Sequence, residues 1–210
     1  MELLVFIIIF IVAIYVGIKL PTWKGRGCEY FVAGKLNQLD PEHYIILNDL
    51  MLSSKGNIET TQIDHIVVSN YGIFILETKA HKGWIFGGVN QRYWTQIIYR
   101  HRQKFYSPLR QNFAHIRAVE NLVSKHLKAP IVSFAVFPIA EKIKISGTDC
   151  VGSARDIIKK INSYTNFIYS NEEKDNIFNL LATGNITNRE VRKRHNRRVK
   201  EIKNEGKAKK

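Results

Sequence analysis

The segment of residues 62–79, QIDHIVVSNYGIFILETK, places the strongest constraint on the fold. Two apolar runs, residues 62–69 and 73–79, flank the turn signal Asn-Tyr-Gly at 70–72. This pattern predicts two antiparallel strands joined by a tight turn. Because side chains alternate along a strand, four residues of the first run are expected to share one face: Gln62, Asp64, Ile66 and Val68.

Two carboxylates and an amine are predicted to converge at the open end of this hairpin. If the loop has an even number of residues centred between Asn70 and Tyr71, Asp64 lies directly opposite Glu77, with Cβ atoms about 4.5–5.5 Å apart. An odd loop without a bulge would put Asp64 on the other face. Lys79 follows Glu77 by two residues on the same face, about 6.6 Å along the strand.

Facing carboxylates repel each other, so a compensating divalent cation is expected beside Asp64 and Glu77. Removal of Glu77 would then relieve repulsion, and the metal-free protein should melt no lower. The alternative is that Asp64, Glu77 and Lys79 are solvent-exposed residues at strand ends, with a local ion pair.

The rest of the chain predicts an α/β domain with a mixed sheet flanked by helices. Short apolar runs bounded by breakers predict further strands at residues 44–50, 84–89, 93–99 and 131–137 and within 143–150. Periodicity and capping residues predict helices at residues 26–39, 107–128, 154–167 and 172–181. Ser107 is expected to be an N-cap, with Pro108 at the first helical position.

An uncharged apolar run precedes this domain. Residues 3–18, LLVFIIIFIVAIYVGI, contain no charge, and a helix extended by two more residues would span roughly 27 Å of an about 30 Å hydrocarbon core. A cleaved signal peptide would need a basic start and a small-residue cleavage site, which are absent. Lys19, Lys24 and Arg26 follow the run. We therefore expect one transmembrane helix within residues 1–22, in the cell membrane, with the domain in the cytoplasm.

Positive charge is concentrated at the C-terminal end. The chain has 32 Lys and Arg against 18 Asp and Glu. Residues 185–210, the basic tail, contain eleven Lys or Arg and three Glu, a net charge of +8. This excess indicates nucleic acid or anionic lipid as a partner, unless the tail is a solvated helix or disordered. The candidate contact residues are Arg192, Lys193, Arg194, Arg197 and Arg198.

Residues 23–150 resemble the nuclease-related domain (NERD) family, a branch of the PD-(D/E)xK restriction-endonuclease-like superfamily. Residues 62–79 look like the core of that family, and KGRGCE at 24–29 resembles its first-helix motif. SPLRQNFAHIRAV at 107–119 is similar to its Pro-x-x-Gln helix start, and VSFAVFP at 132–138 to its next strand. The sequence departs from the family where Cys28 replaces a glycine and, from the superfamily, where Ile63 replaces a proline.

The resemblance implies a restriction-endonuclease-like fold over residues 23–184 and metal-dependent cleavage of phosphodiester bonds, with DNA as the expected substrate. Asp64, Glu77 and Lys79 match the catalytic positions of the superfamily. Asp64 and Glu77 are expected to bind Mg²⁺ or Mn²⁺, and Glu29 matches its accessory metal-binding acid. The alternative is a catalytically silent nucleic-acid-binding protein, or a membrane-surface scaffold, that retains the nuclease fold.

Other polar and aromatic residues have two readings. Gln111 and His115 are four residues apart on a helix, so they share a face. With Gln96 they are candidates for substrate positioning, although a helix cap and a core-edge histidine are the plainer reading. His65 faces away from Asp64 and is expected to be a packed histidine. The residues that could stack on bases or belong to the core are Trp84, Trp94 and Tyr99.

Overall fold

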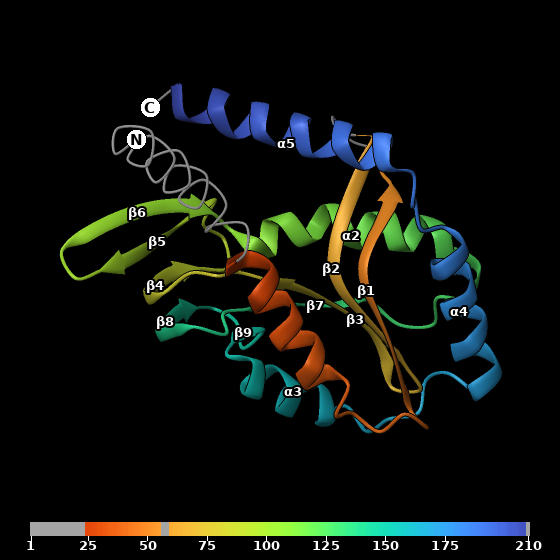
Figure 1. The fold of residues 1–210 in the computed structure, drawn as a ribbon. Coiled ribbons are helices and arrows are strands. Elements are labelled where there is room, and N and C mark those ends of the chain that lie inside the picture. The colour runs from red at the N-terminus through yellow and green to blue at the C-terminus, as the bar shows by residue number, and fades with distance from the viewer. Residues whose placement is uncertain (1–23, 56–58, 209–210) are drawn as a thin grey trace, which may run out of the picture.

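A computed structural model describes residues 24–55 and 59–208, and Figure 1 shows two sheets with helices around them. The first sheet contains, in spatial order, β1 (Tyr44–Ser53), β2 (Thr60–Ser69), β3 (Gly72–Thr78), β7 (Val132–Val136) and β9 (Val151–Gly152). The second contains β6 (His101–Tyr106), β5 (Tyr93–Ile98), β4 (Gly83–Gly88) and β8 (Ala140–Ser146). Both sheets are mixed, because β3, β7 and β9 run parallel in the first and β4 runs parallel to β8 in the second.

The expected single mixed sheet is therefore wrong in one respect, because the chain divides its strands between two sheets. It leaves the first sheet after β3 and turns at Gly83, whose φ is +79°. A Cβ at Gly83 would stand 2.3 Å from the carbonyl oxygen of Ile97, so only glycine allows this approach. β6 was not predicted, because its sequence HRQKFY is polar along most of its length.

Helices cover both faces of the first sheet, which gives three layers. The helices are residues 24–36, α2 (Pro108–Val123), the short 3₁₀ helix η1 (Ser124–His126), α3 (Ala154–Asn162), α4 (Asn171–Thr183) and α5 (Arg189–Ala208). On one face α2 and α4 pack on Ile66 and Ile75. On the other face the helix of residues 24–36 and α3 pack on Val67 and Phe74. These strand residues are completely buried, as alternation between two apolar layers requires.

The β2–β3 hairpin has the predicted even loop. Ser69 pairs with Gly72, so the loop consists of Asn70 and Tyr71, and the ladder continues as far as His65 opposite Leu76. One further step in this register brings Asp64 beside Glu77. Each of these carboxylates therefore lies where the two strands begin to separate.

The predicted alternation along β2 fails before Asp64. Ile63 packs in the same apolar cluster as Ile66 and Val68, whereas Gln62 is turned outward and donates a hydrogen bond to Asp49 Oδ1. The cause lies in the neighbouring strand, where Asp49 has a positive φ of 55°. A residue in this conformation interrupts the pleat. In both β1 and β2, the alternation of side chains between the two faces of the sheet is therefore reversed at this level.

Ser107 occupies the predicted N-cap position of α2, but its side chain makes no capping hydrogen bond. Its backbone oxygen accepts the first helical bond from Gln111 N at 3.1 Å, and its buried hydroxyl has no partner among the described residues. The helices predicted to reach residues 128 and 167 end earlier, at Val123 and Asn162.

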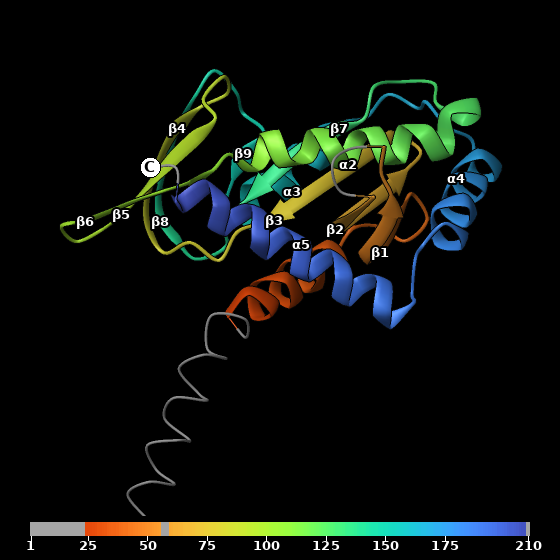
Figure 2. The ribbon, with the colours of Figure 1, turned by 90° about the horizontal axis from the view of Figure 1, so that it is seen from above.

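Residues 189–208 of the basic tail form helix α5, and the residues before it are docked on the domain. Asn185 Oδ1 accepts from Met51 N at 3.0 Å, and Ile186 N donates to Met51 O at 2.7 Å, so the chain extends the β1 edge before α5 begins. In Figure 2, α5 runs between α2 and the helix of residues 24–36. The expected transmembrane segment lies outside the described residues. Within residues 24–55 and 59–208, no helix is both long enough and apolar enough to span a bilayer.

Candidate functional site

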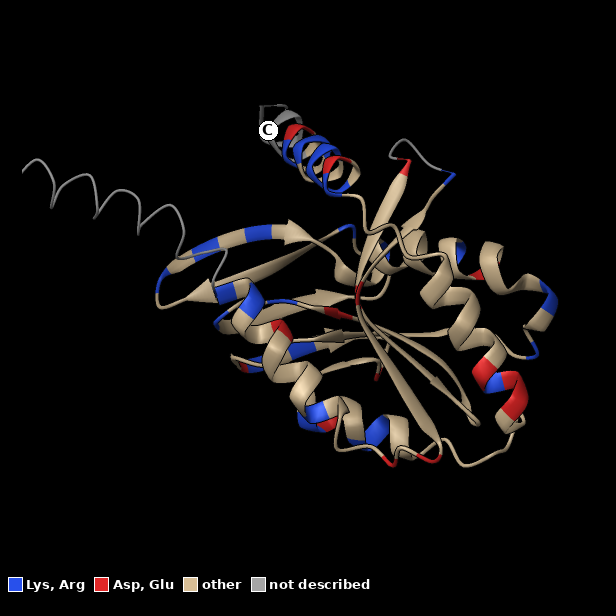
Figure 3. Cartoon of the chain, turned by 45° about the vertical axis from the view of Figure 1, so that its right-hand side comes forward, with Lys and Arg blue, Asp and Glu red and all other residues tan. Residues whose placement is uncertain are grey.

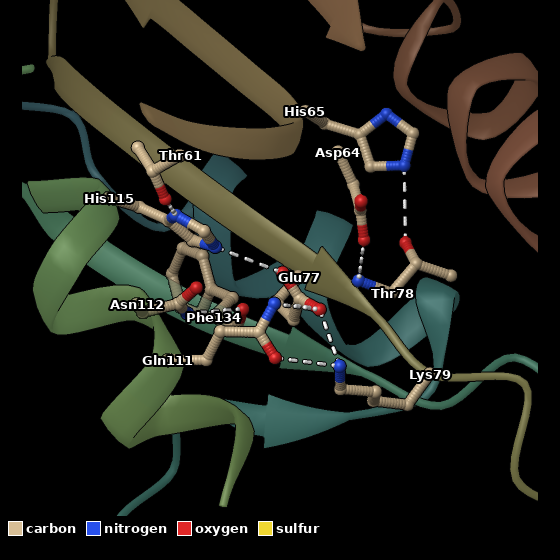
Figure 4. Close-up of polar contacts among 10 residues, drawn as sticks. All are labelled: Thr61, Asp64, His65, Glu77, Thr78, Lys79, Gln111, Asn112, His115 and Phe134. Carbon is tan, nitrogen blue, oxygen red and sulfur yellow. Dashed lines mark hydrogen bonds and ion pairs between the residues drawn. The ribbon is translucent and has the colours of Figure 1, made fainter. Parts of the chain in front are cut away.

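Glu77, at the end of β3, is the centre of a buried polar network (Figure 4). Its Oε1 accepts hydrogen bonds from Lys79 Nζ at 2.5 Å and from Gln111 Nε2 at 2.8 Å. Its Oε2 lies 3.2 Å from His115 Nε2. Lys79 Nζ also donates to Gln111 Oε1 at 2.9 Å, so the lysine, the glutamine and the carboxylate form a closed triangle.

The helix after Pro108 positions two of these partners. Gln111 and His115 are one turn apart on α2, and both point toward the end of β3. A carboxylate only accepts, so His115 Nε2 carries the hydrogen in its contact with Glu77. In the neutral ring Nδ1 is then the acceptor for the hydroxyl of Thr61, 2.7 Å away. Thr61 was missed by sequence reasoning, and its signal is a hydroxyl three residues before Asp64 inside an apolar strand.

The network fixes the charge states of Glu77 and Lys79. Burial raises the pKa of Glu77, but the Lys79 ammonium and His115 outweigh burial and bring that pKa to about 2. Burial lowers the pKa of Lys79, whereas the carboxylate of Glu77 raises it more, and the balance is a raised pKa. The pair is therefore a carboxylate and an ammonium at neutral pH.

Asp64 stands next to this pair, and its pKa is shifted in the opposite direction from that of Glu77. Its Oδ2 accepts from the backbone N–H of Thr78 at 2.7 Å. Burial and then the negative charge of Glu77 raise the pKa of Asp64 well above its usual value. Glu77 engages the nearest cation, so Asp64 adds a negative charge that Lys79 does not fully offset.

Two further acids surround the pair. Burial raises the pKa of Glu29, on the helix of residues 24–36, and the charges of Asp49 and Glu77 raise it further. The charges of Asp49 and Glu77 both act on Glu29, so strand β1 and the first helix bring their acids toward the end of β3. Asp49 was not predicted as a site residue. Its signal is a charge within the apolar run LNDLML.

This donor set fits a divalent cation. Oxygen atoms of Asp and Glu are the ligands that Mg²⁺ prefers, and the raised pKa values of Asp64 and Glu29 indicate negative charge that a cation would offset. In the described chain, three ligand atoms within 4.8 Å of one another occur only at Asp40, Glu42 and His43. That exposed group lies at the turn end of the hairpin, because His43 contacts Asn70.

Two predicted residues lie outside the Glu77 network. Gln96 Nε2 donates to the carbonyl oxygen of Lys82 at 2.7 Å, so it supports the loop between β3 and β4. His65 is buried on the opposite face of β2, as expected, between Asn48 Oδ1 at 2.7 Å and Thr78 Oγ1 at 3.1 Å. Burial lowers the pKa of His65 to about 4, so the ring is neutral at pH 7.

The start of α5 is held at the rim of this site. Arg192 forms an ion pair with Asp49 Oδ1 at 2.5 Å, and His195 Nδ1 lies 2.9 Å from Thr60 Oγ1. The other predicted tail contacts point elsewhere or pair locally: Lys193 with Glu190, Arg198 with Glu201, and Arg194 and Arg197 exposed. Two tail residues therefore reach the domain beside acids of the site.

The three-layer fold and the acid-acid-lysine arrangement at the open end of the hairpin define a nuclease-like α/β domain, and the comparisons agree. The family model described as Nuclease-related domain matches residues 24–138, and the chain belongs to this NERD family. An uncharacterized protein of Bacillus anthracis is 35% identical over 204 residues, which cover 93% of this chain and 95% of that protein. No solved structure matches the chain.

Proposed function

We propose that this protein is a metal-dependent nuclease that hydrolyses phosphodiester bonds of DNA. The observation that carries the proposal is the placement of Asp64, Glu77 and Lys79. Glu77 and Lys79 form a partly buried ion pair, and Asp64 adds a second acid whose charge that pair does not offset. A purely structural ion pair has no need of the second acid, whose presence costs stability.

In this proposal Asp64 and Glu77 hold Mg²⁺ or Mn²⁺, and Glu29 is the accessory acid. The bound cation would offset charge on the scissile phosphate and lower the pKa of a water molecule. Lys79 has the charge and the reach to stabilise the negative charge that builds up on the phosphate. Gln111 holds the ammonium of Lys79 in place and is the residue best set to orient a phosphate oxygen or the attacking water.

The test is cleavage by the full chain, in a non-ionic detergent, of labelled single-stranded and duplex DNA and RNA. We expect cleavage of DNA with Mg²⁺ or Mn²⁺ and none in EDTA. Lys79→Ala should abolish it, whereas the matched control Lys82→Ala, three residues away and exposed, should cleave normally. Absence of cleavage under every metal condition would favour the silent binding protein, and cleavage that persists in EDTA would remove the metal from the proposal.

We also propose that residues 1–22 anchor the domain to the cytoplasmic face of the cell membrane. The support is the sixteen-residue apolar run and the cations that follow it. The full chain should sediment with membranes and be released by detergent but not by high salt. Its domain should resist external protease on intact cells. Release by salt alone, or digestion from outside, would contradict the anchor or its orientation.

A further inference from the structure

The four-stranded sheet has one buried face and one open face. On its buried face, Ile85 and Trp94 pack with Phe105 in one apolar cluster. Successive residues of a strand point to opposite faces, so Trp84 and Tyr106 lie on the other side, where they are 45% and 44% exposed. We call that side the outer face. Figure 1 shows this sheet at the end of the domain opposite α4, away from the layers that cover the first sheet.

Aromatic rings lie on strands β4, β5 and β6 of the outer face. The rings of Trp84 and Phe86 are two residues apart on β4, with centroids 6.2 Å apart. Across β5, Tyr93 pairs with Tyr106 of β6, and their ring centroids are 6.0 Å apart. Trp94, by contrast, is completely buried, and its N–H donates to the carbonyl oxygen of Gly88. The structure thus separates the core tryptophan from the exposed one.

Cations flank these rings along both edges of the sheet. On the β8 side, Lys142 pairs with Trp84 and Lys144 with Phe86, and Lys142 Nζ lies 4.9 Å from the Trp84 ring centroid. On the β6 side, Arg102 and Lys104 share the face of Tyr106. Figure 3 shows Lys and Arg recurring along the β5–β6 hairpin.

The side-chain charges of strands β4, β5 and β6 are all positive. Residues 78–119, which include β4, β5 and β6, contain eight Lys or Arg and no Asp or Glu. On β8 the single acid is Glu141, which lies at the register shift between β4 and β8, directly before Lys142. A face of rings between two rows of cations is complementary to a polyanion that carries flat bases.

The outer face begins close to the candidate catalytic site. Trp84 follows Lys79 by five residues, and five extended residues span at most about 18 Å. A strand held on the outer face can therefore reach Glu77 and Lys79 within a few nucleotides. The proposal below rests on the proposed nuclease function and supplies its substrate class.

We propose that the outer face binds single-stranded nucleic acid. Bases stack on Trp84, Phe86 and Tyr106, while Arg102 and Lys104 on one edge and Lys142 and Lys144 on the other contact the phosphates. Stacking on side-chain rings requires bases that are not already stacked on each other in a duplex, which selects the single strand. Basic edges alone would accept a duplex equally well.

The test is fluorescence anisotropy of a labelled single-stranded oligonucleotide with the full chain in detergent and EDTA, so that binding is measured without cleavage. Trp84→Leu keeps an apolar side chain but removes the ring, and should weaken binding about five-fold to a hundred-fold. Tyr106→Leu should act in the same direction. The matched control is Phe167→Leu, an exposed aromatic residue (66%) that contacts Tyr71 and His43 instead of the outer face.

A second measurement uses the cations. Lys142→Gln with Lys144→Gln should flatten the log–log salt dependence of single-strand binding by about 1.4, since each phosphate contact adds roughly 0.7. Duplex of the same sequence should bind more weakly and respond less to Trp84→Leu. Wild-type affinity in both ring variants, or equal losses on duplex and single strand, would overturn the proposal.

The two proposals fail separately. If single strands bind through Trp84 but no metal supports cleavage, the nuclease proposal fails and the binding face stands. If DNA is cleaved but the ring variants bind and cleave normally, the binding face is wrong and the nuclease proposal stands. Thermal unfolding of each variant shows whether a lost affinity reflects lost fold.

Discussion

Replacement of Glu77 by alanine distinguishes the structure from the sequence pattern most sharply. The pattern of two facing carboxylates predicts relief of repulsion and no loss of stability. The structure predicts the reverse, because Glu77 is the common acceptor for Lys79, Gln111 and His115. Alanine would leave a partly buried ammonium, an amide and an imidazole N–H without their acceptor.

The expected loss follows from this geometry. Removing one partner of a buried ion pair costs about 3–5 kcal/mol. The side chain of Lys79 is 20% exposed and can reach water, and Asp64 can replace part of the lost charge, so the lower end, about 3 kcal/mol, is expected. In a domain of this size each kcal/mol lowers the melting temperature by roughly 2–4 °C, so the total shift is about 6–12 °C.

The assay is thermal unfolding of the full chain in EDTA, with urea unfolding as a check on the slope. Glu77→Gln keeps one oxygen as acceptor for Lys79 and should lie between wild type and alanine. Gln96→Ala removes a side chain whose single hydrogen bond among the described residues is to the loop carbonyl of Lys82, and should change stability by less than about 0.5 kcal/mol. A melting temperature that stays the same or rises in Glu77→Ala would refute the network and restore the repulsion argument.

Three further results are expected. Burial lowers the pKa of His195, and the nearby His115 and Arg192 lower it further. The undocked tail therefore binds protons more readily, so docking of α5 is complete above pH 6.5 and weakens as pH falls below it. Hydrogen exchange in α5 should rise at pH 5.5 in wild type but change less in His195→Gln. Asn70→Ala removes the hydrogen bonds from the Asn70 amide to Tyr169 O and Asn171 Oδ1. It should lower the free energy of unfolding in urea by about 1–3 kcal/mol. An unchanged urea midpoint would show that the turn does not need this side chain. Deletion of residues 189–210 should flatten the salt dependence of DNA binding by several units if the tail contacts about six phosphates, or weaken binding to anionic vesicles by about 1 kcal/mol per basic residue if it contacts lipid.

The hairpin and the helix after Pro108 were predictable because their signals are local. An Asn-Tyr loop between two apolar runs fixes the register, and the register alone brings Asp64 beside Glu77. The spacing of Gln111 and His115 puts both on one face of α2, and that face meets the end of β3. The NERD resemblance adds which residues to look for at this position.

The remaining features depend on contacts between distant segments. The positive φ of Asp49 reverses the faces of two strands, and its signal in the sequence is no more than one acid within an apolar run. Thr61 becomes a partner of His115 only because of that reversal. The division into two sheets depends on how closely the backbone passes Gly83, and the docking of α5 depends on one ion pair to Asp49 and one contact to Thr60. None of these follows from periodicity or composition.

The distribution of charge couples the two proposals. Cations lie on the outer face and along α5, whereas Glu29, Asp49, Asp64 and Glu77 lie near one another at the end of β3. A nucleic acid attracted to the basic surfaces is repelled by this acidic centre until a divalent cation offsets its charge. Metal and substrate should therefore strengthen each other's binding, and the coupling must be equal in both directions. Ca²⁺, which binds carboxylates, should tighten single-strand binding to the wild type but not to Asp64→Asn. Equal tightening in both would mean that the cation acts elsewhere.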